Sequence, residues 1–588
     1  METWAQSAPA TAAPTLLNPD PTPASRDDSE TLEAEKWQRN PANMGSPYVP
    51  LDSWVYPAFE RLIALGYVRT AMLGMRPWTR LECARLVNEA GEELDSADAN
   101  QERAEADALR LRESLDREFS RDRALLNGGS NRGLRLESIY TRVTGIAGNP
   151  LTDGFHFGQT INNDYGRPFA AGLSTVDGFS GSASAGPFTV YLRGEYQHAP
   201  SSPALQATAL QFLSTTDDNL PVPPGVPSPA VNHFQWLDAY VAINAGNWQF
   251  SFGKQSLWWG PSQGGPVMFT NNAAPVNMLR IDRVTPFHLP SVLGVLGPMR
   301  WQFFLGRLSG HEFVYGSSTG LIGQWGHALS DQPFIVGQKL NFKPSPNFEF
   351  GIDYTRIAGG PGQPFTTRQF FKSLFSQGNG SPGSASDPGD VRSGVDFSYK
   401  IPGLRNRLTF YGDAFTEDEK SPLAYPRKSA FQGGIYVPKL PRLPRLDLRL
   451  EGGSTAPVDF PTCNGCFYQN TRFVNAYTNQ GGLMGSWIGR ASQGEQLWST
   501  YWLTPRNKIQ FNFRHRKLDA QFIPHGGTVN DGEVRVEFWT RSNLRVSSAV
   551  QYEKWAIPVL EPAVRSSLTV SVELGLWPRD WGWGASSR

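Results

Sequence analysis

The chemically densest stretch of the chain runs from Gly253 to Arg283 and combines aromatic, amide and cationic side chains. Two adjacent tryptophans lie near its start, amides recur along it, and arginines lie at its end. Aromatic faces stack on the apolar faces of sugar rings, while amide and guanidinium groups bind sugar hydroxyls and carboxylates. We therefore predict a polysaccharide-binding site formed by Lys254, Gln255, Trp258, Trp259, Asn272, Arg280 and Arg283.

Motifs for catalysis are nearly absent from the sequence. The segment Gly316–Gly320 fits the Gly-x-Ser-x-Gly pattern of serine hydrolases, but its flanks indicate a glycine-rich loop and not the required strand-to-helix turn. His311 and Glu312 lack the second histidine of a zinc-protease helix. We predict no catalytic residues, no metal ligands and no cofactor, and hence a protein that is not an enzyme.

The three cysteines indicate structural roles. Cys463 and Cys466 stand in a turn-rich segment that has neither a second ligand pair for zinc nor a following helix start for redox chemistry. We predict that they form a small loop disulfide in an oxidising compartment. Cys83 lies in the apolar stripe of a predicted helix and is expected to be a packed thiol.

The overall composition excludes two classes of protein. Lys plus Arg and Asp plus Glu both total 54, so the net charge gives no support to a nucleic-acid partner. No run of about 18 apolar residues is present, which excludes a helical membrane protein. A membrane β-barrel remains open, because its strands alternate apolar and polar residues.

From Leu134 onward, apolar and polar residues alternate with a period of two almost to the end of the chain. In the segment 508–518, for example, Ile509, Phe511 and Phe513 alternate with polar and charged residues. We count roughly 16 to 18 such segments of about ten residues, the length that a tilted strand needs to cross a membrane. A soluble sandwich rarely has so many strands, and no fixed repeat supports a propeller.

The sequence thus predicts an all-β transmembrane barrel of about 16–18 antiparallel strands over residues 129–588. The apolar face of each strand is expected to meet lipid. The opposite face carries both signs of charge, so neighbouring strands are expected to pair Arg514 or Arg516 with Glu533 or Glu537 across a wet lumen. Long connections rich in Pro, Gly and Ser, at about 200–231, 359–390 and 455–481, are predicted to be extracellular loops.

Residues 234–260 form the clearest predicted hairpin of this barrel. Its first strand is expected to place Leu237 and Val241 on the apolar face and Trp236 and Tyr240 on the opposite face. The turn falls at 245–247, where Gly and Asn tolerate positive φ. An alternative interpretation of the tryptophan pair and the residues after it is an aromatic girdle followed by a loop that folds into the lumen and is held there by hydrogen bonds.

The N-terminal part of the chain has a different character. Residues 1–47 are rich in Ala, Pro, Ser and Asp and are predicted to be a disordered tether. The residues around Trp4–Ala8 are typical of the end of a cleavage region, and we expect an export signal to precede Met1. Residues 48–128 are predicted to form a small α-helical bundle with helices at 54–66, 77–90 and 97–125.

Within this bundle, a Trp/Tyr-Pro helix with a Leu-x-x-x-Gly end precedes a Thr-Arg-x-Glu helix start at Thr79–Glu82. This arrangement resembles a single S-layer-homology module. The resemblance implies contact with peptidoglycan or the cell wall, through Trp54, Tyr56, Arg80 and Glu82. Alternatively, Thr79 and Glu82 form a capping box, which stabilises any helix.

A second resemblance rests on the segments GKQSLWWGP, TNNAAPVNMLRIDR and FFLGRLSG, which lie within residues 250–310. Together they resemble the Wzi-type capsule-assembly family, and the general layout of residues 50–577 agrees. The resemblance implies an outer-membrane barrel of about eighteen strands with an N-terminal helical bundle. It also implies a lectin-like role in holding or organising capsular polysaccharide. The wall-binding-like module and the tail after Trp577 depart from the expected family pattern.

We therefore predict a non-enzymatic barrel in the outer membrane of a Gram-negative-type cell envelope that binds or organises capsular or surface polysaccharide. Its expected partners are that polysaccharide, outer-membrane lipid and peptidoglycan, with no nucleic acid. The alternative is a passive porin anchored to the cell wall through its helical module. An open lumen with rings of mixed charge favours the porin, whereas a plugged lumen favours the binding protein.

Overall fold

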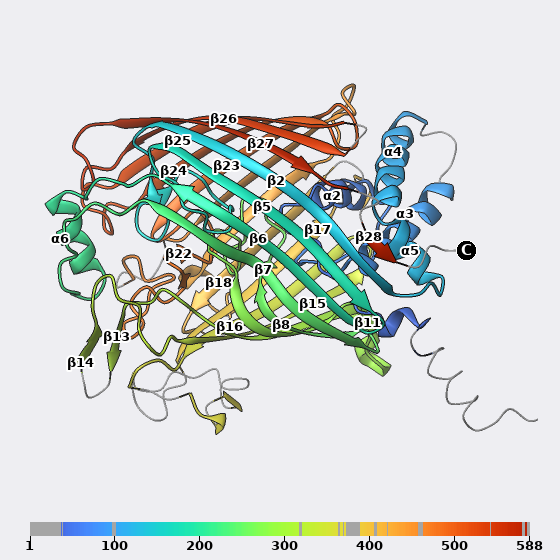
Figure 1. The fold of residues 1–588 in the computed structure, drawn as a ribbon, viewed down its shortest axis with the longest axis horizontal. Helices are drawn as coiled ribbons and strands as arrows, with labels where there is room; N and C mark the ends of the chain where they lie inside the picture. The colour runs from blue at the N-terminus through green and yellow to red at the C-terminus, as the bar shows by residue number, and fades with distance from the viewer. Residues whose placement is uncertain are drawn as a thin grey trace, which may run out of the picture.

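Strands in which apolar and polar residues alternate close into an antiparallel barrel, which makes up the larger part of the chain (Figure 1). The computed structural model describes residues 37, 39–96, 102–316, 320–362, 365–368, 370–371, 389–404, 408–419, 421–456, 463–540, 543–578 and 582–584. Most of the predicted tether and residues 317–319 of the Gly-x-Ser-x-Gly segment lie outside these residues.

The described part of the barrel wall contains 18 long strands, so the predicted fold class is confirmed. Sequence neighbours pair antiparallel, and the last of these strands pairs with the first. The strands are β2 (Arg132–Gly148), β5 (Gly172–Ala185), β6 (Phe188–Ala199), β7 (Val231–Ala245), β8 (Trp248–Gln255), β10 (Val276–Arg283), β12 (Pro298–Arg307), β15 (Phe334–Ser345), β16 (Phe348–Ala358), β17 (Asp390–Lys400), β18 (Thr409–Glu417), β19 (Ala430–Val437), β20 (Leu446–Ser454), β23 (Ser492–Trp502), β24 (Lys508–Leu518), β25 (Gly527–Trp539), β26 (Leu544–Ala556) and β27 (Arg565–Leu576).

Shorter elements complete the described chain. They are η1 (Pro41–Asn43), α2 (Val55–Leu65), β1 (Met75–Arg76), α3 (Arg80–Asp95), α4 (Glu102–Glu118), α5 (Ser120–Leu126), β3 (Thr152–Asp153), β4 (Gly158–Gln159), α6 (Ala207–Thr216), β9 (Trp258–Trp259), β11 (Phe287–His288), η3 (Ser291–Leu296), β13 (Phe313–Gly316), β14 (Gly320–Gly323), η4 (Pro426–Lys428), β21 (Thr478–Asn479), β22 (Gly482–Leu483) and β28 (Gly582–Gly584). The tail after Trp577 contributes β28, which pairs with the first residues of β2. No helix among the described residues is long and apolar enough to cross a membrane.

The two faces of the wall have opposite chemistry. On β24, Ile509, Phe511 and Phe513 are exposed on the outside, whereas Arg514 and Arg516 are buried in the lumen. Apolar side chains such as Phe252, which is 66% exposed, repeat around the outer face. A cationic side chain on a lipid-facing position costs about 2–4 kcal/mol at the bilayer midplane, which accounts for this separation.

Two side-chain assignments in the predicted hairpin, those of Trp236 and Leu237, are wrong, and a β-bulge is the reason. Strand β7 carries an extra residue against β6, because Arg193 pairs with Asp238 while Gly194 pairs with Trp236. An extra residue reverses the faces of the residues before it. Trp236 therefore lies outside, 39% exposed, and Leu237 is fully buried.

The two ends of the barrel differ in the length of their connections. Two-residue turns join β5 to β6, β7 to β8, and β15 to β16, and this end also carries α2–α5 (Figure 1). The opposite end carries the connection around 200–230 and the described parts of those that follow β12, β16 and β20, together with α6, β13 and β14. We call them the short-turn end and the long-loop end.

The helical segments follow the predicted pattern with shifted boundaries. Helix α2 ends at Gly66, which has a φ of 93° that glycine adopts without strain. Helix α3 begins after Thr79, whose hydroxyl accepts a hydrogen bond from the Glu82 N–H, so Pro77 lies outside it. The third predicted helix is divided at Phe119 into α4 and α5. The predicted boundary between a helical and a barrel domain at residue 128 stays a prediction.

Candidate functional site

The lumen is entered by chain segments from both ends, which meet in its interior. Residues 44–80 enter from the short-turn end, and the loop 256–275 between β8 and β10 folds in from the long-loop end. Their contact is the two-stranded sheet of β1 and β9, in which Met75 pairs with Trp259 and Arg76 with Trp258. The Gly260 N–H also donates to the Gly74 carbonyl at 2.9 Å. We call these two segments the plug.

The N-terminal part of the plug is fastened to the barrel wall. The Glu349 carboxylate on β16 accepts hydrogen bonds from the N–H groups of Leu73 and Gly74, at 2.9 and 2.8 Å. The Lys343 ammonium on β15 donates to the Ala71 carbonyl at 2.6 Å. A Cβ at Gly74 would lie 2.4 Å from an Asp396 carboxylate oxygen, so any larger residue would require the wall side chains to move.

The loop part of the plug is held by two wall carboxylates. Asp413 on β18 accepts a hydrogen bond from the Ser262 hydroxyl at 2.6 Å. Glu451 on β20 accepts the N–H groups of Gln263 and Gly264 at 2.6 and 2.9 Å. Buried backbone donors need partners, and these carboxylates supply them where strand pairing is absent.

An apolar cluster fills the lumen around the loop part of the plug. Trp259 is fully buried, with its ring centre 5.8 Å from that of Phe269 and 5.3 Å from that of Phe304 on β12. The loop 463–491 adds Tyr477, whose ring centre is 5.9 Å from that of Phe269. Packed side chains, and not an open channel, therefore occupy this part of the described lumen.

Five of the seven residues predicted to bind polysaccharide are buried within or beside the plug: Gln255, Trp258, Trp259, Asn272 and Arg280. Asn272 accepts the Asn163 N–H at 2.6 Å and donates to the Gly485 carbonyl at 2.9 Å. The Arg280 guanidinium pairs with Asp282 at 2.7 Å and lies 3.9 Å from the centre of the Tyr48 ring. The structure agrees with one half of the alternative interpretation, because the loop folds into the lumen and is held there by hydrogen bonds. The other half is wrong, because the tryptophan pair is buried with the loop and forms no aromatic girdle. Gln255 and Arg280 lie on β8 and β10.

The other two predicted residues lie apart from the plug contacts and from each other. Lys254 is half-buried near the long-loop end of β8, and Arg283 is half-buried at the short-turn end of β10. The Arg283 guanidinium lies 5.4 Å from the ring centres of both Trp248 and Phe287. Polysaccharide contact at the seven positions stays a prediction, and for the buried five it requires movement of the plug.

The four residues predicted to contact the cell wall lie in or beside the helical bundle. Tyr56, Arg80 and Glu82 are buried, and Trp54 is half-buried. Arg80 pairs with Asp122 at 3.0 Å, and Glu82 pairs with Arg85 at 2.7 Å. Because the Glu82 carboxylate turns to Arg85, the structure shows only the Thr79 half of the capping box. Contact with the wall through these residues stays a prediction.

A polar cavity of about 380 Å³ lies in the lumen beside the plug, against β23–β27 and β2. Its volume falls within the roughly 300–1,000 Å³ of ligand pockets. One aromatic residue, Trp498, lines it together with ion pairs and a set of amide and hydroxyl side chains. The amides and hydroxyls are Thr144, Thr160, Asn162, Asn163, Gln263, Gln496, Gln510, Asn512, Ser547, Gln551, Thr569 and Ser571.

The ion pairs of this cavity differ from those expected. Strand register places Arg514 opposite Asp531, and the two side chains pair at 2.6 Å. Arg516 donates instead to the Phe157 carbonyl at 2.9 Å, and Glu537 pairs with Lys508 at 3.5 Å. The predicted alternation identified the lumen face, but the cavity itself was missed because it depends on where the plug leaves space.

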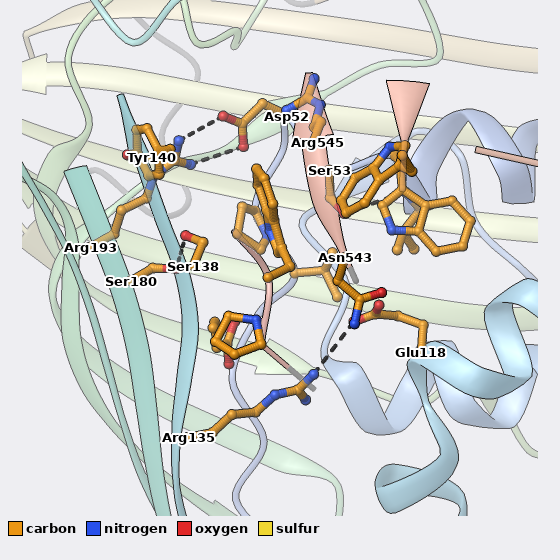
Figure 2. A pocket seen from close by; sticks show the side chains of 18 of the residues that line it. Asp52, Ser53, Glu118, Arg135, Ser138, Tyr140, Ser180, Arg193, Asn543 and Arg545 are labelled. Carbon is orange, nitrogen blue, oxygen red and sulfur yellow. Dashed lines mark hydrogen bonds and ion pairs between the residues drawn. The ribbon is translucent and has the colours of Figure 1, made fainter. Parts of the chain in front are cut away.

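A second, smaller pocket of about 80 Å³ lies at the short-turn end, between the helices and the barrel rim (Figure 2). Asp52, just before α2, accepts two hydrogen bonds from Arg193 on β6, at 2.9 and 2.7 Å. About 40% of the Asp52 side chain is exposed. Desolvation in the pocket favours the neutral acid, but the Arg193 guanidinium outweighs it and lowers the pKa of Asp52 below its usual range. Asp52 therefore anchors the plug as a carboxylate.

At the long-loop end, a buried histidine joins three separate segments. His156 Nδ1 lies 2.7 Å from Asp153, and its Nε2 lies 3.0 Å from Asp217 at the end of α6. Asp217 also pairs with Arg490 at 3.1 Å. Burial alone would lower the pKa of His156, but the two carboxylates raise it to about 9.

The cysteines behave as predicted. Cys463 and Cys466 form a disulfide, and Cys83 is a fully buried free thiol. Across the described segments, no group of three or more His, Cys, Asp or Glu side chains is arranged to hold a metal ion.

Comparison with known proteins places this geometry in context. The family described as capsule assembly protein Wzi matches residues 142–569. A curated relative, an uncharacterized 55.8 kDa protein in the cps region of Klebsiella pneumoniae, is 28% identical over 208 residues, which are 35% of this chain and 37% of that protein. The match thus spans little more than a third of that relative's length.

Two solved structures are similar in fold. Wzi of Escherichia coli, described as an outer membrane protein involved in group 1 capsule assembly and a carbohydrate-binding β-barrel, superposes with a TM-score of 0.61 at 16% identity, over 91% of this chain and 99% of that one. OccD3 (OpdP) of Pseudomonas aeruginosa has a TM-score of 0.40 at 8% identity, over 76% of this chain and 92% of that one. The first similarity extends over most of both chains and shows a shared fold. The second is too remote to bear on function.

Proposed function

Since the chain belongs to the capsule assembly protein Wzi family, we propose that it is an outer-membrane β-barrel that binds or organises capsular or surface polysaccharide. It does so without catalysing a reaction. The Escherichia coli relative is described as carbohydrate-binding, and the fold that the two proteins share supports the same role here.

The plug is the observation that carries this proposal. An N-terminal segment and a wall-anchored loop meet inside the lumen, and an apolar cluster packs around their junction. A passive porin needs a water-filled path, so the porin alternative is not supported. A barrel whose interior is filled by its own chain is suited to holding a ligand.

The ends of the barrel set its orientation in the envelope. Outer-membrane barrels have short turns toward the periplasm and long loops toward the outside. The long-loop end, with α6, therefore faces the extracellular polysaccharide, and α2–α5 face the periplasm. Outer-membrane lipid surrounds the exposed apolar rows, and contact between the periplasmic helices and peptidoglycan remains part of the proposal.

Polysaccharide retention tests the proposal directly. We expect the purified protein, immobilised in detergent, to retain purified surface polysaccharide of its own cell, whereas an unrelated barrel of similar size does not. Retention that equals that of the unrelated barrel would contradict the proposal. Conductance in planar bilayers tests the porin alternative. Large steady openings of the native protein would support that alternative.

A further inference from the structure

The lumen cavity and the pocket at the short-turn end adjoin each other and share part of their lining. The shared residues are Asp52, Arg545 and Glu573, which we call the neck. Figure 2 shows Asp52 and Arg545 side by side at this neck, with Arg193 on the neighbouring wall. The Arg545 guanidinium pairs with Glu573 at 3.1 Å, and Asp52 with Arg193 at 2.7 Å, so the neck is formed by paired charges.

At the long-loop end the lumen cavity is closed. The loop at 160–164 covers it, and the Thr160 carbonyl accepts hydrogen bonds from Arg514 and Gln551 of the wall, both at 3.1 Å. Beyond the loop lies an apolar cluster that includes Phe157, Phe212 of α6 and Phe522. The described residues thus seal the cavity on the extracellular side with packed side chains.

At the short-turn end the pocket is rimmed by tryptophans. Trp539 and Trp577 have ring centres 5.0 Å apart, and the Arg506 guanidinium lies 4.3 Å from the ring centre of Trp54 and 5.1 Å from that of Trp539. All three tryptophans line the pocket. Aromatic side chains with an apolar body and a polar edge suit the stacking of sugar rings.

The cavity wall offers hydrogen bonds but little free charge. Its arginines and carboxylates are paired with one another: Arg142 with Asp164 at 2.6 Å, Arg535 with Glu533 at 2.9 Å, and Arg514 with Asp531. Ion pairs that are already made give little attraction to a strongly charged ligand. The amides Gln510 and Asn512 each make one hydrogen bond within the wall, to Thr500 and from Gln496, both at 2.9 Å. A primary amide has two N–H donors and a carbonyl acceptor, so each keeps further groups that suit the hydroxyls of a sugar.

We propose that the pocket and the lumen cavity are continuous past the neck and form a blind vestibule, open to the periplasm, that binds the end of an uncharged oligosaccharide segment of the surface polysaccharide. The proposal rests on the proposed function and adds the side of entry, the location and the chemical class of the bound segment. The sugar enters past the tryptophans of the rim, passes Asp52 and Arg545, and binds the amides between β23 and β26.

Thiol labelling in cells tests the side of entry. Ala549→Cys places a thiol on the cavity wall, Ser130→Cys places one beyond α5 at the short-turn end, and Ser201→Cys places one on an extracellular loop. The probe is a maleimide on a slender linear polymer too large for general porins. In intact cells we expect only Ser201→Cys to react; after permeabilisation of the outer membrane, all three react. The native protein is the unreactive control, because Cys83 is fully buried and Cys463 and Cys466 form a disulfide.

Protection of the same thiol tests binding. Six-sugar fragments from partial hydrolysis of the cell's surface polysaccharide, at about ten times their dissociation constant, slow the labelling of purified Ala549→Cys about tenfold. Adding Asn512→Leu weakens the fragment's affinity about fivefold to a hundredfold, because a sugar hydroxyl then lacks its partner. Asn232→Leu, at an exposed amide near the long-loop end, serves as the matched control and leaves protection unchanged.

The outcomes separate this inference from the proposed function. Reaction of the position 549 thiol in intact cells overturns the vestibule, as does failure of the folded variant to react after permeabilisation. Retention of whole polysaccharide without any protection by fragments also overturns the vestibule and leaves the proposed function standing. Absence of both retention and protection overturns both.

Discussion

Met75 lies opposite Trp259 in an antiparallel pair inside the barrel, although the two residues reach that point from opposite ends of the molecule. The pair links the helical segment of the short-turn end to the loop that folds in from the long-loop end. It places Trp259 where its indole N–H reaches Gln302 on the wall and its ring meets Phe269 and Phe304. We therefore expect this arrangement to obstruct conduction through the lumen.

Removing the loop part of the plug should open the lumen. Replacing residues 261–272 by a short Gly-Ser linker removes the segment that Asp413 and Glu451 hold. In planar bilayers we expect frequent, long-lived openings from this variant and none from the native protein. Equal conductance of the two would show that the loop does not obstruct a path.

Placing a cation on the outer face should destabilise the barrel in the membrane. Phe513→Arg on β24 introduces a guanidinium at an exposed apolar position, at an expected cost of about 2–4 kcal/mol. Gln510→Arg, on the lumen face of the same strand, is the control and should cost much less. Urea unfolding in lipid vesicles measures the free energy of unfolding of both variants. A similar loss for the two variants would argue against the assigned faces.

Removing the carboxylate that joins α2 to the wall should loosen the helices. Glu60 pairs with Arg76 at 2.8 Å and with Arg449 on β20 at 2.6 Å, and all three are buried. Glu60→Ala leaves two buried guanidinium groups without this partner, and we expect a loss of about 3–5 kcal/mol. Glu93→Ala removes the partner of the exposed Arg69 and should cost at most about 1 kcal/mol. Denaturant unfolding, with proteolysis of the helices as a second readout, distinguishes the two.

The long-loop end should weaken in alkali. The pKa of His156 is raised to about 9, from a usual value of 6.5, so its pairs with Asp153 and Asp217 stabilise the fold fully below pH 6.5. That stabilisation falls as the pH rises through about 9, because the imidazolium loses its proton. Protease cleavage in the α6 region should therefore accelerate from pH 7 to pH 10, after correction with an unstructured peptide. His156→Gln should show a flatter profile; an unchanged profile would contradict the pairing.

The barrel could be predicted from sequence because strand alternation is a local property that the membrane enforces residue by residue. The disulfide and the end of helix α2 at Gly66 could also be predicted, because each depends on residues that lie close together in the sequence. The inversion at Trp236 was not, since a bulge depends on how β7 aligns with β6. The seven predicted binding residues were chosen for their chemistry, which suits a sugar and a buried plug contact equally well. The lumen cavity depends on what the plug leaves unfilled, which no local pattern records.

The junction of β1 and β9 also joins two segments that are separately fastened to the barrel wall, the first by Glu349 and Lys343 and the second by Asp413 and Glu451. A displacement of either segment is therefore opposed by the two residue pairs of the junction and by the wall. We expect the two segments to move together, and only when these wall contacts are released.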